Sequence, residues 1–187
     1  MAKLIYVANV SLDGFVEDEH GGFEWTAPPD DERFAFITNL VRPAGTYLYG
    51  RRMYETMAVW ETEHSLAAES ELRADFAHMW QAADKIVYST TLDATWTANT
   101  RLERRFDPES IGEMKAAAGR DLTVGGANLA AHAFRSGLVE ECHLFVCPIL
   151  IGRGKPSLPS ELRAELEVLD ERRFDDGAVY LRYGIPN

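Results

Sequence analysis

The residue types best suited to chemistry in this sequence follow short apolar runs. Residues 122–124 form one such run, and Gly125-Gly126 comes directly after it, followed by helix-forming residues at 127–134. Glycine accepts backbone angles that other residues resist and adds no side chain. A strand that ends in this way leaves free backbone N–H groups at the start of a helix, where an anion can bind. The pair therefore indicates either a phosphate-binding turn or a tight turn without a ligand.

Two further apolar runs end in groups that can bind phosphate. Residues 46–49 are followed by Gly50-Arg51-Arg52, and residues 85–88 are followed by Ser89-Thr90-Thr91. Ligands of open α/β sheets collect at the carboxyl ends of the strands. Guanidinium groups, hydroxyls and backbone N–H groups are the donors that a phosphorylated ligand requires. We therefore expect these strand ends to form one ligand site.

Arg51 and Arg52 lie where a short helix, residues 51–57, is expected to begin. The helix macrodipole disfavours positive charge at that end. An anionic ligand would supply the missing negative charge. The alternative is that one of the two arginines forms an ion pair with Glu55.

Other motifs do not support the chemistry that they superficially suggest. In GRGKPS, residues 152–157, a proline follows the lysine and the upstream glycine spacing of a phosphate loop is absent. Cys142, His143 and Cys147 lack the spacing of metal ligands, so we predict no metal site. The sequence also lacks the GxSxG motif of an esterase nucleophile.

The elements that must position these groups predict a single α/β domain, residues 1–187. Apolar runs predict strands at 3–10, 46–49, 85–88, 121–124, 139–151, 165–174 and 178–183. Helices are expected from residue 28 and at 51–57, 69–83, 108–118 and 126–136, and residues 11–29 read as an irregular segment. Strands alternate with helices first, and a hairpin closes the chain around the Asp-Gly step at 176–177. We expect a mixed, mostly parallel sheet with antiparallel C-terminal strands and helices on both faces.

Charge and cysteine content limit the compartment and the partners. A net charge of −11 argues against a general nucleic-acid-binding protein, which needs a basic face. The apolar N-terminal segment is too short for a membrane span and lacks a signal-peptide layout. Cys142 and Cys147 would face opposite sides of one strand and could not readily pair. We expect a reduced, cytoplasmic protein that binds a small molecule.

The ordered set of motifs resembles the dihydrofolate reductase-like superfamily, and more narrowly the reductase (RibD C-terminal) domain of bacterial riboflavin biosynthesis. The matching segments are SLDG at 11–14, YGRRMYE at 49–55, VYST at 87–90, VGGANL at 124–129 and PILIGRGKP at 148–156. They occur in the family's order and cover nearly the whole chain. The resemblance implies a mixed eight-stranded sheet with an NADPH site over the strand ends.

By position, the resemblance also implies which residues bind the cofactor. It places Gly50, Arg51 and Arg52 by the adenosine 2′-phosphate, Ser89 and Thr90 by the ribose-phosphate, Gly125, Gly126 and Ala127 by the pyrophosphate, and Asn9, Gly14 and Val16 by the nicotinamide.

The predicted activity is the NADPH-dependent reduction of a small cytoplasmic metabolite, a pyrimidinone or pterin-like compound with a C=O or C=N bond. Phe15, Trp25 and Trp60 are candidate walls of the substrate pocket, with core packing as the alternative. Asp31 or Glu32 is the candidate proton donor, from a group of acids that also includes Asp30. Solvent water is the alternative donor, and these acids can also simply begin a helix.

Two alternatives to this activity remain open. A non-catalytic nucleotide-binding or sensory module would carry the same phosphate-binding motifs, and a flavin-using reductase would be yellow when purified. We also expect a homodimer, because residues 139–151 are long and apolar for an edge region and exposed edges are usually covered. The alternative is that the last two strands cover this run within one chain.

Overall fold

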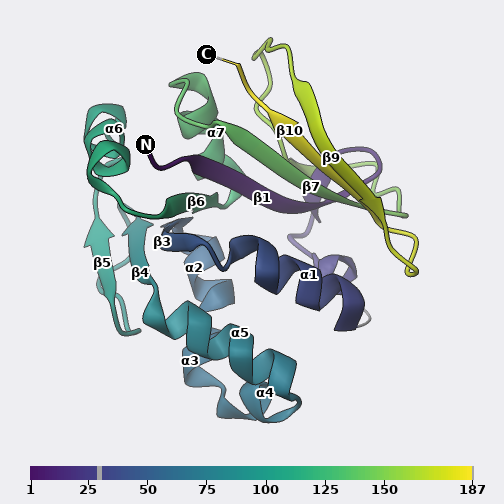
Figure 1. The fold of residues 1–187 in the computed structure, drawn as a ribbon, viewed down its shortest axis with the longest axis horizontal. Coiled ribbons are helices and arrows are strands. Elements are labelled where there is room, and N and C mark those ends of the chain that lie inside the picture. The colour runs from purple at the N-terminus through teal and green to yellow at the C-terminus, as the bar shows by residue number, and fades with distance from the viewer. Residues whose placement is uncertain (29–30, 187) are drawn as a thin grey trace.

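The computed structural model describes residues 1–28 and 31–186. Its main sheet has eight strands (Figure 1). In their order across the sheet they are β5 (Thr100–Glu103), β4 (Asp84–Tyr88), β3 (Ala44–Gly50), β6 (Asp121–Gly125), β1 (Leu4–Ser11), β7 (Glu141–Cys147), β10 (Val179–Gly184) and β9 (Glu167–Arg173). Neighbours from β5 to β7 run parallel, whereas β10 is antiparallel to both β7 and β9. The predicted mixed, mostly parallel sheet is confirmed.

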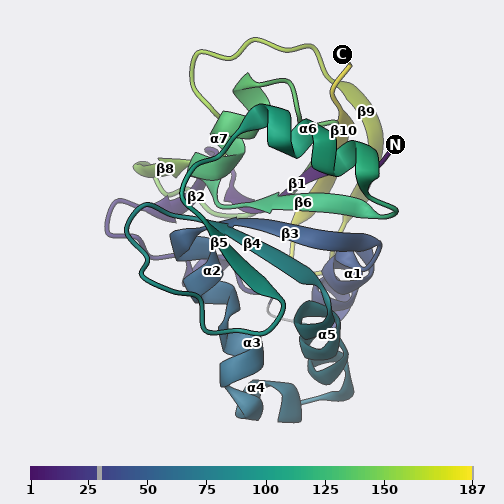
Figure 2. The ribbon, with the colours of Figure 1, turned by 90° about the vertical axis from the view of Figure 1, so that its left-hand side faces the viewer.

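Helices cover both faces of this sheet, as predicted (Figure 2). One face carries α6 (Pro108–Ala117) and α7 (Ala127–Arg135), and the other carries α1 (Asp31–Val41), α2 (Arg51–Met57), α3 (Val59–Thr62), α4 (His64–Ala68) and α5 (Glu71–Ala82). Successive side chains of a strand point to opposite faces. Leu4 and Tyr6 of β1 therefore pack with α6 and α7, whereas Tyr47 and Tyr49 of β3 pack with α2 and α5.

Two short strands and several short elements were not predicted. β2 (Phe15–Asp18) pairs antiparallel with β8 (Gly154–Pro156), and the 3-10 turn η1 (Glu24–Thr26) follows within the segment that the sequence suggested to be irregular. β5, α3 and α4 were also missed. Short polar strands have a weak sequence pattern because a distant segment supplies their hydrogen bonds and packing.

The position of β7 corrects the basis of the homodimer prediction. The run at 139–151 contains a strand only at Glu141–Cys147, and this strand lies between β1 and β10. It is not an edge, because the last two strands of the same chain cover it. The edges of the main sheet are β5 and β9.

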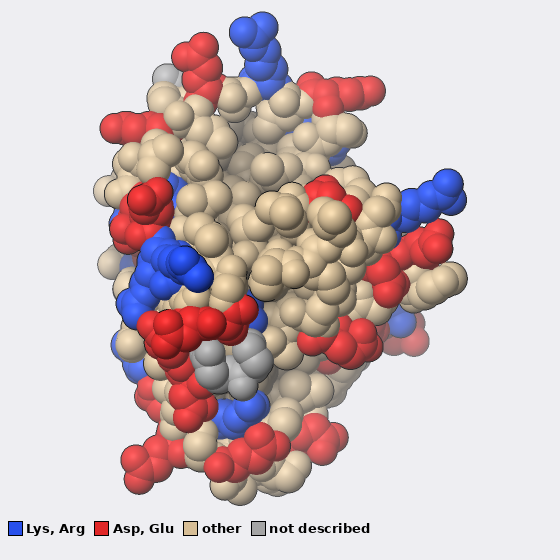
Figure 3. Space-filling model, turned by 90° about the vertical axis from the view of Figure 1, so that its right-hand side faces the viewer, with Lys and Arg blue, Asp and Glu red and all other residues tan. Residues whose placement is uncertain are grey.

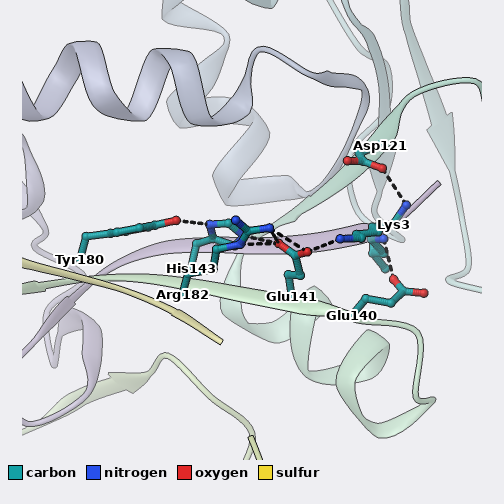
Figure 4. Close-up of polar contacts among 8 residues, drawn as sticks. Lys3, Asp121, Glu140, Glu141, His143, Tyr180 and Arg182 are labelled. Carbon is teal, nitrogen blue, oxygen red and sulfur yellow. Dashed lines mark hydrogen bonds and ion pairs between the residues drawn. The ribbon is translucent and has the colours of Figure 1, made fainter. Parts of the chain in front are cut away.

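A buried polar network joins the beginnings of β1 and β7 to β10 (Figure 4). The Tyr180 hydroxyl donates to His143 Nδ1 at 2.8 Å, and His143 Nε2–H donates to Glu141 at 3.1 Å. These roles require a neutral imidazole with its proton on Nε2, and burial lowers the pKa of His143 accordingly. Glu141 also accepts from Arg182 at 2.8 Å and from Lys3. Burial alone would raise the pKa of Glu141, but hydrogen bonds from Arg182, Lys3 and His143 outweigh it and hold the pKa at about 2.

Candidate active site

A cavity of about 620 Å³ lies on the face of the sheet that α1, α2 and α5 cover. Its floor is formed by residues of β1, β3 and β6, and its walls by α1, α2, α3 and α5. Residues of the segment between β1 and α1 also line it. At one end the cavity reaches the turn between β6 and α7. Its volume is in the range of small-molecule sites.

The glycine turn at the end of β6 forms as predicted, and Gly125, Gly126 and Ala127 line the cavity. A Cβ atom on Gly125 would lie 2.8 Å from the ring of Tyr49 on the neighbouring strand. Gly126 has a φ of +94°, which favours glycine. Because Gly126 precedes α7 and has no side chain to cap it, the first N–H groups of α7 are available as anion donors.

Arg52 lies at the same end of the cavity, within a cluster of three charged groups. Arg52 Nη1 is 2.9 Å from Glu17 Oε1, and Lys155 Nζ is 2.6 Å from the same oxygen. All three side chains line the cavity. Two cations share one carboxylate here, so the rim has an excess of positive charge close to the glycine turn. We call Glu17, Arg52 and Lys155 the charged rim.

Arg51 does not line the cavity. Its Nε is 2.7 Å from Glu55 Oε1, so the ion pair considered as the alternative is present, and its Nη1 donates to Thr91 Oγ1 at 3.0 Å. Ser89 Oγ accepts the backbone N–H groups of Thr91 and Leu92 and thereby stabilises the turn after β4.

Four other residues of the predicted cofactor site also lie outside the lining. They are Gly14, Gly50, Ser89 and Thr90, whereas Asn9 and Val16 are within it. The strand ends that were expected to meet do lie side by side, because β4, β3 and β6 are neighbours in the sheet. Tyr49 of β3 is in register with Gly125 of β6, directly before the two turns.

Asn9 of β1 is oriented by a buried arginine that the sequence analysis missed. Arg33 Nη1 donates to Asn9 Oδ1 at 3.2 Å, and a guanidinium can only donate. The contact therefore fixes the amide with its NH₂ group available for a ligand. Arg33 is held by Asp176, with Nε 2.7 Å from the carboxylate, and it donates to the Ala27 carbonyl at 3.2 Å. An arginine in the first turn of α1, next to apolar residues, is the sequence signal that could have drawn attention to it.

The rest of the cavity is mostly aromatic and apolar, with Glu55 and several threonines also in its lining. Trp60, a predicted pocket wall, lines it, with its ring centroid 5.8 Å from Phe34 and 4.7 Å from Phe76. The two other predicted walls, Phe15 and Trp25, are not among the lining residues. Trp25 lies in η1, where its buried Nε1 has no hydrogen-bond partner within the described structure.

The structure places both candidate proton donors outside the cavity. Asp31 and Glu32 begin α1, and both are exposed. Glu32 Oε1 lies 2.5 Å from Arg172 Nη2 of β9, so this acid forms an ion pair. Acids at this end of a helix interact favourably with its macrodipole. Asp30 lies outside the described residues.

The two cysteines are not among the residues that line this cavity. Across residues 1–28 and 31–186, we find no group of three or more His, Cys, Asp or Glu side chains suited to hold a metal ion. Cys142 and Cys147 are free and buried, and burial raises the pKa of both thiols. The helices of the described part of the chain are too short or too polar to span a bilayer.

Comparisons with known proteins find a similar sequence in one bacterial protein and a similar fold in others. An uncharacterized protein of Bacillus subtilis (strain 168), YyaP, is 26% identical over 183 residues, which are 97% of this chain and 94% of that protein. A crystal structure from Shewanella sp. PV-4, provisionally assigned to riboflavin biosynthesis, matches with a TM-score of 0.74 and 19% identity over 100% of both chains.

A third relative combines two activities in its name. It is the diaminohydroxyphosphoribosylaminopyrimidine deaminase/5-amino-6-(5-phosphoribosylamino)uracil reductase of Thermotoga maritima, with a TM-score of 0.64 and 14% identity over 99% of this chain and 57% of that one. These structural matches show the fold. The RibD C-terminal domain family matches the sequence over residues 2–180, and the chain therefore belongs to the RibD C-terminal domain family.

Proposed function

We propose that this protein is an NADPH-dependent reductase of a small cytoplasmic metabolite with a pyrimidinone or pterin-like C=O or C=N bond. Membership of a family with reductase relatives supports a reductase. The observation that carries the proposal is the continuity of the cavity, in which one volume joins the glycine turn, the charged rim and an aromatic compartment. Such a cavity can hold a phosphate-bearing cofactor at one end and a flat substrate at the other.

The nicotinamide cofactor would supply the hydride, and the residues of this chain would bind and orient it. Backbone N–H groups at Gly125, Gly126 and Ala127 fit a pyrophosphate. Arg52 of the charged rim fits the 2′-phosphate, with Arg51, the residue before it, adding positive charge. Asn9 and Val16 lie on the part of the cavity where the nicotinamide is expected.

The proton that follows the hydride comes, in our proposal, from solvent water. Asp31 and Glu32 lie outside the cavity, which favours the alternative considered from the sequence. The aromatic and apolar walls would exclude most water from the reacting atoms, so that only a few molecules reach the substrate.

Cofactor titration followed by a substrate screen tests this proposal. NADPH fluorescence should change on binding, and NADPH should be consumed with at least one pyrimidinone or pterin. Binding without turnover on any such compound would favour the non-catalytic module. A yellow purified protein would favour a flavin-using reductase, and absence of NADPH binding would contradict the proposal.

We also propose a homodimer whose interface is the edge strand β9, because β7 lies inside the sheet. All seven residues of this edge strand are exposed. Leu166, Val168 and Leu169 are 45%, 60% and 43% exposed. The side of the molecule that carries β9 shows a broad uncharged area, with many of the charged side chains along its margin (Figure 3). The other five residues of β9 are charged, so the apolar contact would come from Val168, Leu169 and the preceding Leu166. An exposed edge strand offers unpaired backbone groups that can pair with a second copy.

A further inference from the structure

We infer that the substrate of this reductase is an uncharged, flat compound that carries no phosphate group. The inference rests on the proposed function and specifies its substrate. It follows from how charge and aromatic side chains are distributed along the cavity.

The part of the cavity away from the glycine turn is a compartment of apolar side chains. Phe34 and Ile37 of α1, Met57 of α2, Trp60 of α3 and Phe76 of α5 line it. Phe34, Trp60 and Phe76 form a three-membered cluster, with ring centroids 4.7 to 5.8 Å apart. Such rings bind other flat rings by stacking and edge-to-face contacts. The compartment therefore suits a flat heterocycle with apolar substituents.

Both cations that line the cavity belong to the charged rim, at the other end of α2. Among the described lining residues, Arg52 and Lys155 are the only cations, and both already contact Glu17. Arg52 lies in the first turn of α2 and Met57 is its last residue. A rise of 1.5 Å per residue separates them by roughly 8 Å along the helix. A phosphate in the aromatic compartment would thus lie beyond the reach of the rim, which the cofactor phosphate would occupy.

Cations outside the lining also approach the compartment. The Arg73 guanidinium lies 5.5 Å from the Phe34 ring centroid and is paired with Glu69, whereas Arg33 acts through a neutral group. Its charge is matched by Asp176, with both side chains buried. It orients the Asn9 amide, so that the group offered to a ligand is a neutral NH₂ donor. This donor fits a carbonyl oxygen, that of the nicotinamide amide or of a heterocycle that lies beside it. A phosphate in the same place would have no unmatched positive charge beside it, and burying it would be costly.

These features separate the substrate from the one for which the Thermotoga maritima relative is named, which contains a phosphoribosyl group. The same kind of heterocycle would fit the compartment once the phosphate is removed.

Ligand binding to the intact protein tests this inference. The probes are 5-amino-6-(5-phosphoribosylamino)uracil, the same compound after phosphatase treatment, and 6-phenylpterin. Binding is measured with saturating NADP⁺, so that the cofactor phosphate occupies the charged rim and no turnover occurs, by the further quenching of tryptophan fluorescence, because Trp60 and Trp80 line the cavity. We expect the dephosphorylated compound to bind at least about tenfold more tightly than its phosphorylated form, a difference of about 1.4 kcal/mol, and 6-phenylpterin to bind more tightly still. Equal or tighter binding of the phosphorylated compound would overturn the inference, and so would failure of all three to bind at millimolar concentration.

A charge placed in the compartment gives a second, independent readout. Met57→Lys adds an ammonium group there, and Ala116→Lys adds the same charge at an exposed position of α6. Met57→Lys should reduce the preference for the dephosphorylated compound by about tenfold, whereas Ala116→Lys should leave it unchanged. If Met57→Lys does not fold, Thr56→Lys takes its place, because Thr56 lines the same cavity from an exposed position. An unchanged preference in the folded variant would overturn the inference. NADPH is titrated separately: absence of cofactor binding would contradict the reductase proposal, whereas a preference for the phosphorylated compound in the cofactor-loaded protein would overturn only this inference.

Discussion

Replacing Arg52 by alanine should weaken the binding of NADPH and leave that of NADH almost unchanged. Arg52 lines the cavity next to the glycine turn and belongs to the charged rim. The two cofactors differ only by the 2′-phosphate, so a residue that binds this phosphate affects only one of them. The affinity ratio of NADPH to NADH therefore isolates the contribution of Arg52.

The structure limits the size of this effect. A hydrogen bond to a charged group contributes about 1.5–3 kcal/mol. Arg52 must share or give up its contact with Glu17, an exposed type of ion pair that contributes about 0.2–1 kcal/mol. Its side chain is 66% exposed, so salt screens the new contact as well. The net loss should be about 1–2 kcal/mol, or about five- to thirtyfold in affinity.

Three variants make the measurement specific. Glu17→Gln removes the carboxylate that competes for Arg52 and Lys155, so it should tighten NADPH severalfold with little effect on NADH. Arg101→Ala removes an exposed arginine that pairs with Glu103 on β5, and it should change neither affinity. Arg51→Ala should act in the same direction as Arg52→Ala and more weakly, because Arg51 contacts Glu55 and Thr91 and does not line the cavity.

The assay is fluorescence titration of NADPH and NADH at fixed ionic strength, repeated at higher salt, which should reduce the NADPH preference of the unmodified protein. If Arg51→Ala and Arg52→Ala both leave the affinity ratio unchanged, the arginines have a structural role and the 2′-phosphate does not bind at this strand end.

Three further predictions concern the glycine turn, the buried network and assembly. Gly125→Ala should lower the free energy of unfolding by about 1–3 kcal/mol, because its Cβ would lie 2.8 Å from the Tyr49 ring. Gly112→Ala on α6, where the added Cβ meets open space, should raise it by up to about 1 kcal/mol. Equal urea midpoints for the two variants would contradict this prediction. The folded pKa of Glu141 is about 2, below the ordinary 4.5, so its contribution to stability is present above pH 4.5 and is lost as the pH falls toward 2. Urea unfolding across that window should show a shallower pH dependence for Glu141→Gln than for the unmodified protein, and identical slopes would show that the network does not act through this carboxylate. Sedimentation should show a dimer that Val168→Asp on β9 dissociates and Leu12→Asp, at another exposed site, does not; a monomer at micromolar concentration would end the homodimer proposal.

The sequence by itself determined the fold class and the glycine turn after β6 that lines the cavity. Strand and helix patterns are local, because apolar spacing of two or 3.6 residues reflects which face of one element is buried. The glycine pair at 125–126 was informative because both positions favour glycine over residues with a side chain. A Cβ on Gly125 would lie too close to Tyr49, and Gly126 has a positive φ. Because strands alternate with helices along the chain, the sequence also predicted that the carboxyl ends of several parallel strands lie at one edge of the sheet.

Tertiary structure alone decided which side chains meet in the cavity. Glu17 on β2, Arg52 on α2 and Lys155 on β8 come together through pairings between distant segments, and no local period signals them. The strand β7 was expected at an edge and lies inside the sheet, because strand order depends on where the last hairpin packs. The acids at the start of α1 were expected in the pocket, yet Arg33 from the same turn points to Asn9 while Glu32 pairs with β9. The turn of a helix fixes which residues share a face, but only the packing of that helix on the sheet determines which face meets the ligand.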